Sequence, residues 1–462
     1  MQILRSRRSR RAVAPQPTGA CGAPRSSMYF GPDGTVRACC VNTTYTLGKI
    51  GEQSIREVWE GARIAAMRDA LDAHDYSLGC RDCEHRVAAG DRAWSTAPQY
   101  DEYLDDEPGE FPRRMDFILS ITCNLQCAMC DGELSSSIRL HREKRPPLPP
   151  AYGDAFFDEL REFLPHLDLA VFLGGEPFVA REPQRVFDLM IELGTAAEVR
   201  VVTNGTQWNP RVERYLRGLP VNVAVSIDGH SATTLESLRV GVDRDRLFAN
   251  LGHYQEAVAG HEGTVSIHFC LMRQNWHEFA DLLLEADRRD IHVIVMTVTG
   301  PAGFSLWDLP APELREVLDG LERRGEQVAD RLGRNREVWN DELARVRRHL
   351  AALEEGALPE WVTTSWGVDA GVPVELGPRP ASSDVRAVAS LVPGVATATG
   401  AQLEEELERW AGRQPLVLHL VGSTIGGVDE VGWAAPLDPG GWVGLDVKDL
   451  VARLGDIGRA HV

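Results

Sequence analysis

Three closely spaced cysteines are the residues of this 462-residue chain best suited to chemistry. Cys123, Cys127 and Cys130 form a C-x3-C-x2-C run. Three thiolates on one tight loop can hold three irons of a [4Fe–4S] cluster and leave the fourth iron without a protein ligand. An open coordination position can bind a reacting molecule, whereas a metal site closed by four protein ligands is usually structural. The alternative is a zinc knuckle, for which the nearest fourth ligand is His141, eleven residues further on.

A second group of cysteines comes earlier in the chain, at Cys21, Cys39, Cys40, Cys80 and Cys83. The first residues of the chain are basic but lead into no hydrophobic core, so they predict an unstructured tail rather than a secretion signal. We therefore expect a cytoplasmic protein, in which disulfides are rare and clustered cysteines indicate a metal site.

Polar residues follow several apolar runs of the chain. The sequence GGEP occupies positions 174–177, Asn204 ends the run VRVVTN, and Ser226 and Asp228 end VNVAVSID. Glycines permit close backbone approach, and a glutamate can accept hydrogen bonds from an ammonium group. Arg239 offers a two-pronged donor to a carboxylate. For Asn204 and Asp228 the alternative is turn and cap chemistry at strand ends.

Six short apolar runs must position these residues. They are DFILSI, LAVFLG, VRVVTN, VNVAVSID, TVSIHFCL and HVIVMTV, and helical patterns separate them between positions 111 and 300. Strands that alternate with helices predict an α/β fold with a parallel sheet, closed into a barrel or part of one. The polar residues would then lie at the C-terminal strand ends, where barrel enzymes place their active sites.

The N-terminal region is predicted to hold a hairpin and a helix. The turn Pro32-Asp33-Gly34 separates two β-prone runs, which favours a β-hairpin. A helix is expected from about Ser54 to Leu71, because helical spacing places four apolar residues on one buried face: Ile55, Val58, Trp59 and Ala62.

The composition divides the chain into five segments. They are a disordered basic tail at 1–17, a cysteine-bearing domain at 18–95, an acidic linker at 96–110, a core at 111–305 and a C-terminal helical and α+β appendage at 306–462. The appendage contains the apolar run LVLHLVG and ends in a predicted helix. The net charge of −19 argues against nucleic acid or an anionic membrane as partner. No run reaches the roughly 18 apolar residues of a membrane span.

The C-x3-C-x2-C run, GGEP and SIDG, in this order, resemble the motifs of the radical S-adenosylmethionine (SAM) superfamily over about residues 111–300. The resemblance implies a partial (β/α)6 barrel of the TIM type. It also implies that the open iron binds SAM and that an electron from the cluster splits SAM into methionine and a 5′-deoxyadenosyl radical. Met129 stands where the family often has an aromatic residue beside the adenine. The expected SAM contacts are Met129, Gly174, Gly175, Glu176, Pro177, Asn204, Ser226, Asp228 and Arg239.

The earlier cysteines resemble the four-cysteine "twitch" form of the SPASM extension, whose pattern is C, then G-x4-C, then C-x2-C. Cys21, Gly34-x4-Cys39 and Cys80-x2-Cys83 match it. The resemblance implies a second, auxiliary [4Fe–4S] cluster on Cys21, Cys39, Cys80 and Cys83, placed before the barrel rather than after it. A zinc ribbon is the alternative. Cys40 is then expected to be a small buried hydrophobe.

Strand alternation places possible substrate contacts inside the barrel. In TVSIHFCL, the residues Ser266, His268 and Cys270 share the face opposite to the apolar one. We therefore expect His268 and Cys270 to line the interior, where Cys270 could return a hydrogen atom to a substrate radical. The alternative for Cys270 is a buried core residue. Asn275 is expected to cap the following helix.

Together these features predict an enzyme that cleaves SAM and abstracts hydrogen from a peptide or from a sugar or other small metabolite. The resemblance implies a net oxidation, a dehydrogenation or an epimerisation, with an external flavodoxin-like or ferredoxin-like electron donor. The alternative is a catalytically degenerate protein that serves as a partner-binding scaffold or electron-transfer module.

Overall fold

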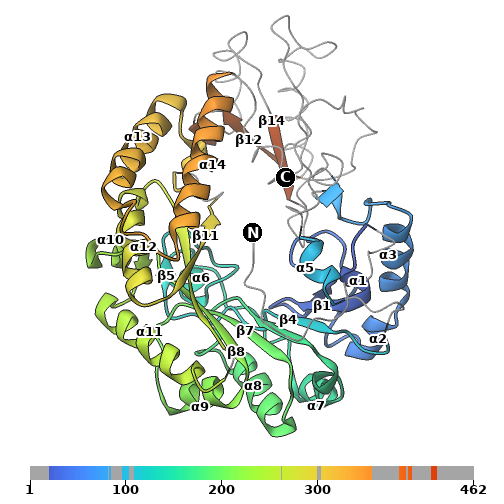
Figure 1. The fold of residues 1–462 in the computed structure, drawn as a ribbon. Helices are drawn as coiled ribbons and strands as arrows, with labels where there is room; N and C mark the ends of the chain where they lie inside the picture. Colours follow the sequence, from blue (N-terminus) through green and yellow to red (C-terminus); the bar gives the residue numbers. More distant parts are fainter. Residues whose placement is uncertain are drawn as a thin grey trace, which may run out of the picture. The chain divides into compact units, whose positions relative to one another are not determined.

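The computed structural model describes residues 20–81, 83–84, 96–103, 109–261, 263–298, 303–355, 384–391, 394–397 and 418–423. The chain divides into two compact units. The first is Met1–Leu306 with Glu316–Arg348, and the second is Trp307–Arg315 with His349–Val462. A nine-stranded sheet forms the centre of the first unit (Figure 1).

Six neighbouring strands of this sheet are parallel, and they follow one another in the sheet in the order of the chain. They are β4 (Arg114–Phe117), β6 (Leu169–Phe172), β7 (Glu198–Thr203), β8 (Val221–Ser226), β10 (Val265–Leu271) and β11 (His292–Thr297). Five of them coincide with predicted apolar runs, whereas β4 begins two residues before the run DFILSI and shares only Asp116 and Phe117 with it. The predicted parallel α/β sheet is confirmed.

Five helices lie along the outer side of the curved sheet (Figure 1). They are α7 (Asp154–Phe163), α8 (Arg181–Leu193), α9 (Pro210–Gly218), α11 (Arg244–Val258) and α12 (Phe279–Arg288). The pleat gives the sheet two different faces. In β8 the residues Val221, Val223 and Val225 are buried, whereas Asn222, Ala224 and Ser226 are half-buried. The helices therefore cover the apolar face, and the partly covered inner face carries the polar residues.

The N-terminal hairpin belongs to the same sheet. The hairpin strands β1 (Ser27–Phe30) and β2 (Thr35–Arg37) are antiparallel, and β3 (Gly48–Lys49) pairs with β2. β1 also pairs in parallel with β4. Side chains reinforce this junction, because the rings of Phe30, Phe117 and Phe172 lie in one row with centroids 5.7 and 5.1 Å apart. The hairpin was predicted, but its union with the barrel sheet was not.

The predicted helix from Ser54 to Leu71 is two helices, so that part of the prediction was wrong. α2 (Ile55–Trp59) begins with a capping box between Ser54 and Glu57, and α3 (Ala62–Asp72) begins after Gly61. A Cβ on Gly61 would lie 2.6 Å from the Glu57 carbonyl oxygen, so the chain turns most easily at a glycine. The turn changes the helical phase, and Ala62 is exposed while Ile55, Val58 and Trp59 are buried.

A carboxylate of helix α7 accepts hydrogen bonds from the N-terminal end of α2. Glu159 of α7 accepts hydrogen bonds from the backbone N–H groups of Ile55 (2.8 Å) and Arg56 (2.9 Å). An acidic side chain at this end satisfies free donors and the positive end of the helix dipole. The cysteine-bearing region thus contacts the parallel α/β part of the fold through a helix as well as through the sheet.

Part of the segment predicted as an acidic linker is packed in the fold. It includes the short helix α5 (Pro98–Asp101), whose Tyr100 is fully buried. Tyr103 packs against Leu169 and Val171 on the inner face of β6. Residues 104–108 of the predicted linker lie outside the described residues.

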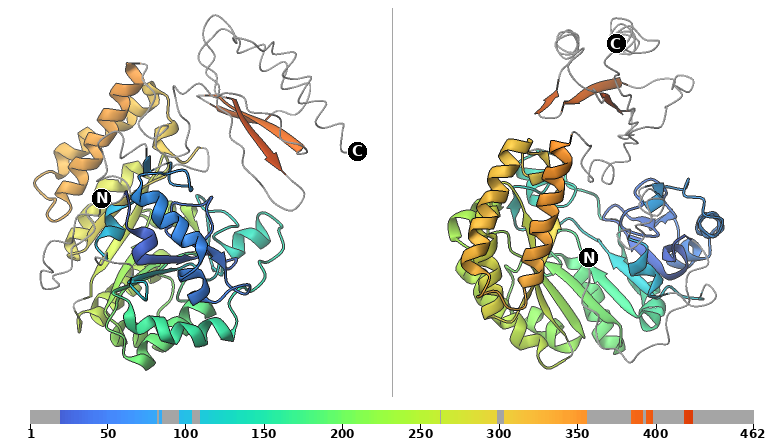
Figure 2. Two further views of the ribbon diagram at one scale, coloured as in Figure 1. Left: turned by 90° about the vertical axis from the view of Figure 1, so that its right-hand side faces the viewer. Right: turned by 45° about the horizontal axis from the view of Figure 1, so that its top comes forward.

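Two long helices follow the sixth parallel strand, α13 (Ala311–Val328) and α14 (Arg336–Glu354) (Figure 2). Trp339 of α14 stacks on Phe279 of α12 with ring centroids 5.4 Å apart. The contacts therefore assign Glu316–Arg348 to the first unit, although the sequence placed these helices in the appendage.

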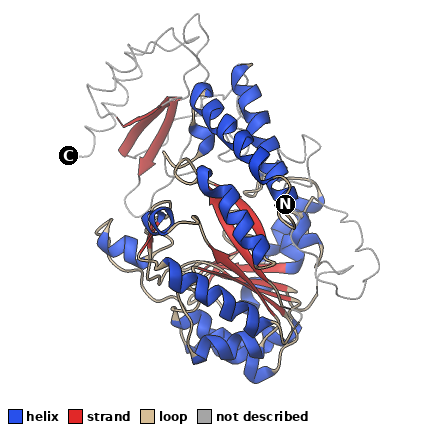
Figure 3. Cartoon of the chain, turned by 60° about the vertical axis from the view of Figure 1, so that its left-hand side comes forward, coloured by secondary structure: helices blue, strands red, loops and turns tan. Residues whose placement is uncertain are grey.

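The second unit contains an antiparallel sheet of three strands, coloured red like all strands in Figure 3. They are β12 (Asp384–Leu391), β13 (Gly394–Thr397) and β14 (Leu418–Ser423), with β12 in the middle. The apolar run LVLHLVG supplies β14, and the predicted final helix lies outside the described residues. In the described part of the chain, no helix is long and apolar enough to cross a membrane.

Candidate functional site

The loop with the three cysteines is held on both sides by backbone. The short strands β5 (Gln126–Cys127) and β9 (Arg239–Val240) pair antiparallel, which places Cys127 opposite Arg239. At the start of α6 (Ser136–His141), the Ser136 hydroxyl accepts a hydrogen bond from the Cys123 N–H at 3.2 Å. The preceding Ser135 hydroxyl donates to the Leu125 carbonyl oxygen at 2.9 Å. Strand pairing and the two serine hydroxyls therefore hold the loop at several points.

Arg142 also contacts this loop, which was not predicted from the sequence. Its guanidinium donates to the carbonyl oxygen of Cys127 at 3.2 Å and also to that of Cys130. These bonds hold the second half of the loop from the C-terminal end of α6. His141, the zinc ligand considered above, is exposed.

The three thiols form one electrostatic group. Burial raises the pKa of the Cys130 thiol to about 12, and the neighbouring sulfurs of Cys127 and Cys123 raise it further. The Leu125 N–H donates to Cys123 Sγ at 3.5 Å, and Arg239 Nη1 lies 3.8 Å from Cys127 Sγ. Donors at the sulfurs favour the thiolates that an iron–sulfur cluster requires.

This donor set fits a cluster with an open iron, because it consists of three thiols on one loop. Among the described residues, no three His, Cys, Asp or Glu side chains form a group that could hold one metal ion. A [4Fe–4S] cluster does not require the thiolates to converge on one point, because each thiolate binds a different iron.

The GGEP turn packs directly against this loop. Gly174 and Gly175 have φ angles of 74° and 53°, in the left-handed region that favours glycine. A Cβ on Gly175 would lie 2.6 Å from the Thr122 carbonyl oxygen. The Glu176 N–H donates to that same oxygen at 2.8 Å. The two glycines therefore let the turn meet the residue just before Cys123.

We expect Gly175→Ala to destabilise the protein by at least about 2 kcal/mol, because it adds a clash with Thr122 to the cost of a left-handed alanine. Urea unfolding, together with the iron content after reconstitution, would measure the effect. Gly194→Ala is the matched control, since Gly194 has φ 62° and nothing within 4 Å of its Cβ position. Equal losses in the two variants would show that the close approach has no energetic weight.

The carboxylate of Glu176 is turned into the protein. The side chain is fully buried and accepts hydrogen bonds from the Thr203 hydroxyl (2.7 Å), the Asn204 N–H (2.6 Å) and the Phe178 N–H (3.1 Å). Burial raises its pKa to about 7, although these bonds act in the opposite direction. Both oxygens are thus used to join the GGEP turn to the end of β7. The expected hydrogen bond to an ammonium of SAM would have to compete with them.

Asn204 combines turn chemistry with a contact to the cysteine loop. Its Oδ1 accepts from the Thr206 N–H at 3.0 Å, which is the turn role considered above. Its Nδ2 donates to Asn124 Oδ1 at 3.0 Å and lies 3.9 Å from Cys123 Sγ. The end of β7 is thereby brought to the first cysteine.

Asp228 and Arg239 form a buried ion pair at the end of β8. Asp228 Oδ2 lies 2.6 Å from Arg239 Nε, and its Oδ1 accepts from the Cys270 N–H at 2.7 Å. Ser226 is half-buried on the inner face and lies opposite His268 in the register of β8 and β10. The structure therefore gathers these five predicted residues around β10 and the end of β8.

The prediction that Asn275 caps a helix was wrong. Asn275 precedes the 3-10 turn η3 (Trp276–Glu278), but its side chain makes no capping hydrogen bond. Instead its amide donates to the carbonyl oxygens of Asp228 (3.0 Å) and Cys270 (2.8 Å), and its Oδ1 accepts from the Met272 N–H. It is fully buried, so the three bonds join the ends of two strands.

His268 and Cys270 occupy the inner face as expected. Burial lowers the pKa of His268 to about 4, and the charge of Arg239 lowers it further, so the imidazole is neutral at pH 7. Burial and Asp228 raise the pKa of Cys270 to about 12, so the thiol keeps its proton. Cys270 and Met129 pack against the same apolar cluster of Leu238, Met272 and Val298. These apolar contacts connect the part of the loop next to Cys130 with β10.

Glu278 is a site residue that the sequence did not reveal. It accepts from the N–H groups of His230 and Ser231 and from the hydroxyls of Ser231 and Thr234, at 2.5–3.0 Å. These residues start helix α10 (Ala232–Leu238), which leads directly to Arg239. Burial alone would raise the pKa of Glu278, but the hydrogen bonds outweigh it and lower the pKa to about 2.

We expect Glu278→Gln to reduce the free energy of unfolding by about 2 kcal/mol at neutral pH, because a charged acceptor of several hydrogen bonds is lost. A depressed folded-state pKa stabilises above the unfolded value near 4.5 and loses its effect as the pH falls toward 2. The deficit should therefore stay constant in urea unfolding at pH 5, 6 and 7. Glu256→Gln, at an exposed position of α11, is the control. A deficit that varies within this pH range would contradict the assignment.

The four predicted ligands of the auxiliary site lie together in the structure. The thiols of Cys39 and Cys83 raise the pKa of Cys21, and that of Cys80 raises the pKa of Cys39, in both cases after the larger effect of burial. Asn42 links two of them, because its N–H donates to Cys39 Sγ at 3.4 Å and its Nδ2 to Cys80 Sγ at 3.6 Å. This arrangement fits the predicted four-thiolate site.

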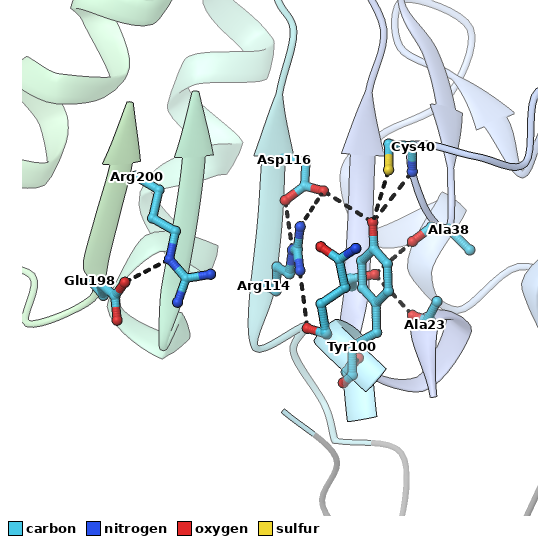
Figure 4. Close-up of polar contacts among 11 residues, drawn as sticks. Ala23, Ala38, Cys40, Tyr100, Arg114, Asp116, Glu198 and Arg200 are labelled. Atoms are coloured by element: carbon cyan, nitrogen blue, oxygen red, sulfur yellow. Dashed lines mark hydrogen bonds and ion pairs between the residues drawn. The ribbon is translucent and has the colours of Figure 1, made fainter. Parts of the chain in front are cut away.

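Cys40 is exposed, so its predicted burial was wrong. Its Sγ lies 3.6 Å from the hydroxyl of Tyr100, which also lies 3.4 Å from Asp116 Oδ2 (Figure 4). Asp116, on β4, accepts two hydrogen bonds from the buried Arg114 at 2.8 and 3.1 Å. A polar chain therefore runs from the residue beside Cys39 to the first barrel strand.

Comparison with known proteins agrees with these two sites. Residues 21–84 match SPASM, described as an iron–sulfur cluster-binding domain, and residues 117–286 match the radical SAM superfamily. An AdoMet-dependent heme synthase of Methanosarcina barkeri is 33% identical over 136 residues, 28% of this chain and 34% of that protein. A 7-carboxy-7-deazaguanine synthase of Aquifex aeolicus is 30% identical over 106 residues, 23% of this chain and 42% of that protein.

Solved structures with partial likeness include Streptococcus suis SuiB bound to S-adenosylmethionine, at 14% identity and a TM-score of 0.35 over 55% of this chain and 60% of that one. Another is anSMEcpe with bound AdoMet, at 17% identity and a TM-score of 0.34 over 46% and 60% of the two chains. The chain thus spans well under two thirds of its curated relatives. The cofactors that its domains imply are a SAM-binding [4Fe–4S] cluster, an auxiliary cluster and SAM. The chain carries a radical SAM domain and, before it, a SPASM iron–sulfur domain that shares its sheet.

Proposed function

We propose that this protein is an enzyme that cleaves SAM reductively and abstracts a hydrogen atom from an organic substrate. The observation that carries the proposal is the loop of Cys123, Cys127 and Cys130, which provides three thiols and is held in place by neighbouring elements. When bound, the [4Fe–4S] cluster supplies the electron that splits SAM and so yields the radical.

The remaining site residues have distinct tasks in this proposal. The GGEP turn and Asn204 bring the ends of β6 and β7 to the loop, so that their backbone can meet the amino-acid part of SAM. Met129 offers an apolar surface for the adenine. Ser226 and His268 lie on the inner face as neutral groups for the substrate. A flavodoxin-like or ferredoxin-like protein is the proposed electron donor.

The substrate that we propose first is a peptide, because SPASM-type extensions accompany peptide modification in the family that the motifs resemble. Oxidation or epimerisation of a small metabolite is the second candidate. The two curated relatives support it, since both are named for small-molecule synthases.

For an epimerisation we propose Cys270 as the hydrogen-atom donor. Its thiol is protonated, and Cys270 packs against the same apolar cluster as Met129, the residue before the third cysteine of the loop. Cys270→Ala should leave 5′-deoxyadenosine formation intact. It should also abolish the deuterium that the product acquires from D2O through the exchangeable thiol. Unchanged deuterium in the product would remove Cys270 from this role.

Reconstitution tests the proposed function directly. The full chain is loaded anaerobically with iron and sulfide, reduced with dithionite and incubated with SAM. We expect 5′-deoxyadenosine and methionine in equal amounts. A fully loaded protein that forms neither would instead support the scaffold or electron-transfer alternative.

A further inference from the structure

A buried guanidinium lies against one sulfur of the cysteine loop. The pairing of β9 with β5 places Arg239 opposite Cys127, and Nη1 lies 3.8 Å from Cys127 Sγ. Only 9% of Arg239 is exposed. Strand pairing and burial therefore keep this positive charge beside the sulfur. A surface arginine could instead move away into solvent.

One carboxylate faces the same guanidinium from the other side. Asp228 Oδ2 lies 2.6 Å from Arg239 Nε, and Asp228 is fully buried. The two atoms are not aligned for a hydrogen bond, and among the described residues neither atom has another hydrogen-bond partner. Asp228 also covers the Nε edge of Arg239, which a two-pronged contact with a SAM carboxylate could use. The guanidinium of Arg239 therefore lies at the sulfur through Nη1, and its Nε edge is not free to bind SAM.

Stabilisation of the fold does not by itself explain the buried ion pair of Asp228 and Arg239. Burial of two charges costs about as much free energy as their attraction returns. Neutral hydrogen bonds from Asn275 already join the ends of β8 and β10, and Glu278 already fixes the start of α10. The pair is the part of this region that places charge near the cysteine loop.

We propose that Arg239 and Asp228 set the reduction potential of the cluster on Cys123, Cys127 and Cys130, with opposite signs. This inference rests on the proposed function, since it requires a redox-active cluster in the loop. Reduction adds one negative charge to the cluster. Arg239 stabilises that charge through Cys127 and raises the potential, whereas Asp228 opposes it and lowers the potential. Both are tuning residues, and the proposal assigns them no bond to the substrate.

Redox titration of the reconstituted full chain, followed by EPR, tests the proposal. The signal that is missing in Cys130→Ala identifies this cluster. At a fixed potential, Arg239→Gln should decrease the ratio of reduced to oxidised cluster about tenfold, a shift of 59 mV for one electron. Asp228→Asn should increase the ratio by a similar factor, and the double variant should return toward the wild type.

Two controls separate charge from structure. Arg246→Gln removes an exposed arginine of α11 and should leave the potential unchanged. Arg239→Lys keeps the charge and should stay near the wild-type potential. If Arg239→Gln does not retain iron, the test rests on Asp228→Asn alone, which should raise the reduction potential of the cluster.

The inference is overturned if both neutral variants shift the potential in the same direction, or if neither shifts it at full iron content. Its failure differs from failure of the proposed function. Wild-type protein that binds the cluster and forms 5′-deoxyadenosine, with an unchanged potential in both variants, refutes only the inference. Wild-type protein without a redox-active cluster refutes the proposed function as well.

Discussion

Cys130→Ala should lower the iron content of the reconstituted protein from about eight to about four atoms per chain and abolish the formation of 5′-deoxyadenosine. The physical reason is that three thiolates hold three irons of the cluster, and no fourth ligand on the loop can replace a lost one. Cys130 is half-buried and precedes α6, so its replacement disturbs the fold less than that of the buried Cys127. The remaining iron should belong to the auxiliary site.

Iron and sulfide analysis, together with chromatographic detection of 5′-deoxyadenosine, would measure this result. Cys40→Ala is the matched control, because Cys40 belongs to neither set of ligands in our assignment and is exposed. It should keep both clusters and full SAM cleavage. Wild-type amounts of 5′-deoxyadenosine in Cys130→Ala would contradict the placement of the catalytic cluster.

Cys39→Ser and Cys40→Ser should have opposite outcomes although the two residues are adjacent. Cys39 is 7% exposed, and its sulfur accepts a hydrogen bond from Asn42 within the group of auxiliary thiols. Cys40 is exposed and lies toward Tyr100 and Asp116 instead. We therefore expect Cys39→Ser to lose about four irons per chain and Cys40→Ser to lose none.

SAM cleavage provides a second readout for the comparison of Cys39→Ser with Cys40→Ser. Cys39→Ser should still cleave SAM, because the loop at 123–130 is supported by α6 and β9, and both lie outside the auxiliary site. Iron analysis and Mössbauer spectroscopy would count the remaining cluster. The ligand assignment is reversed if Cys40→Ser loses the iron. A zinc ribbon is indicated if the wild type holds zinc and only one cluster.

The auxiliary region is attached to the parallel sheet by backbone pairing and by side-chain contacts. β1 is hydrogen-bonded to β4 over four residue pairs, and Tyr100 and Asp116 bridge the same junction. A shared sheet fixes the two sites relative to each other more firmly than a flexible linker would.

The sequence alone determined the local features of this protein. The six apolar runs predicted the parallel strands, because β-branched residues and the period of two are local properties. The spacing of Cys123, Cys127 and Cys130 predicted the cysteine loop for the same reason. The hairpin was predictable from Pro32-Asp33-Gly34, since the turn depends on adjacent residues.

Only the tertiary structure decided which distant groups meet. The pairing of β1 with β4, the burial of Tyr100 and the exposure of Cys40 depend on contacts between segments far apart in the chain. Asn275 looked like a helix cap because cap residues are recognised locally, but the carbonyl groups of Asp228 and Cys270 competed successfully for its amide. The charge of Arg239 beside Cys127 likewise arises from strand pairing across more than a hundred residues. Such contacts are set by packing and register, which no local spacing encodes.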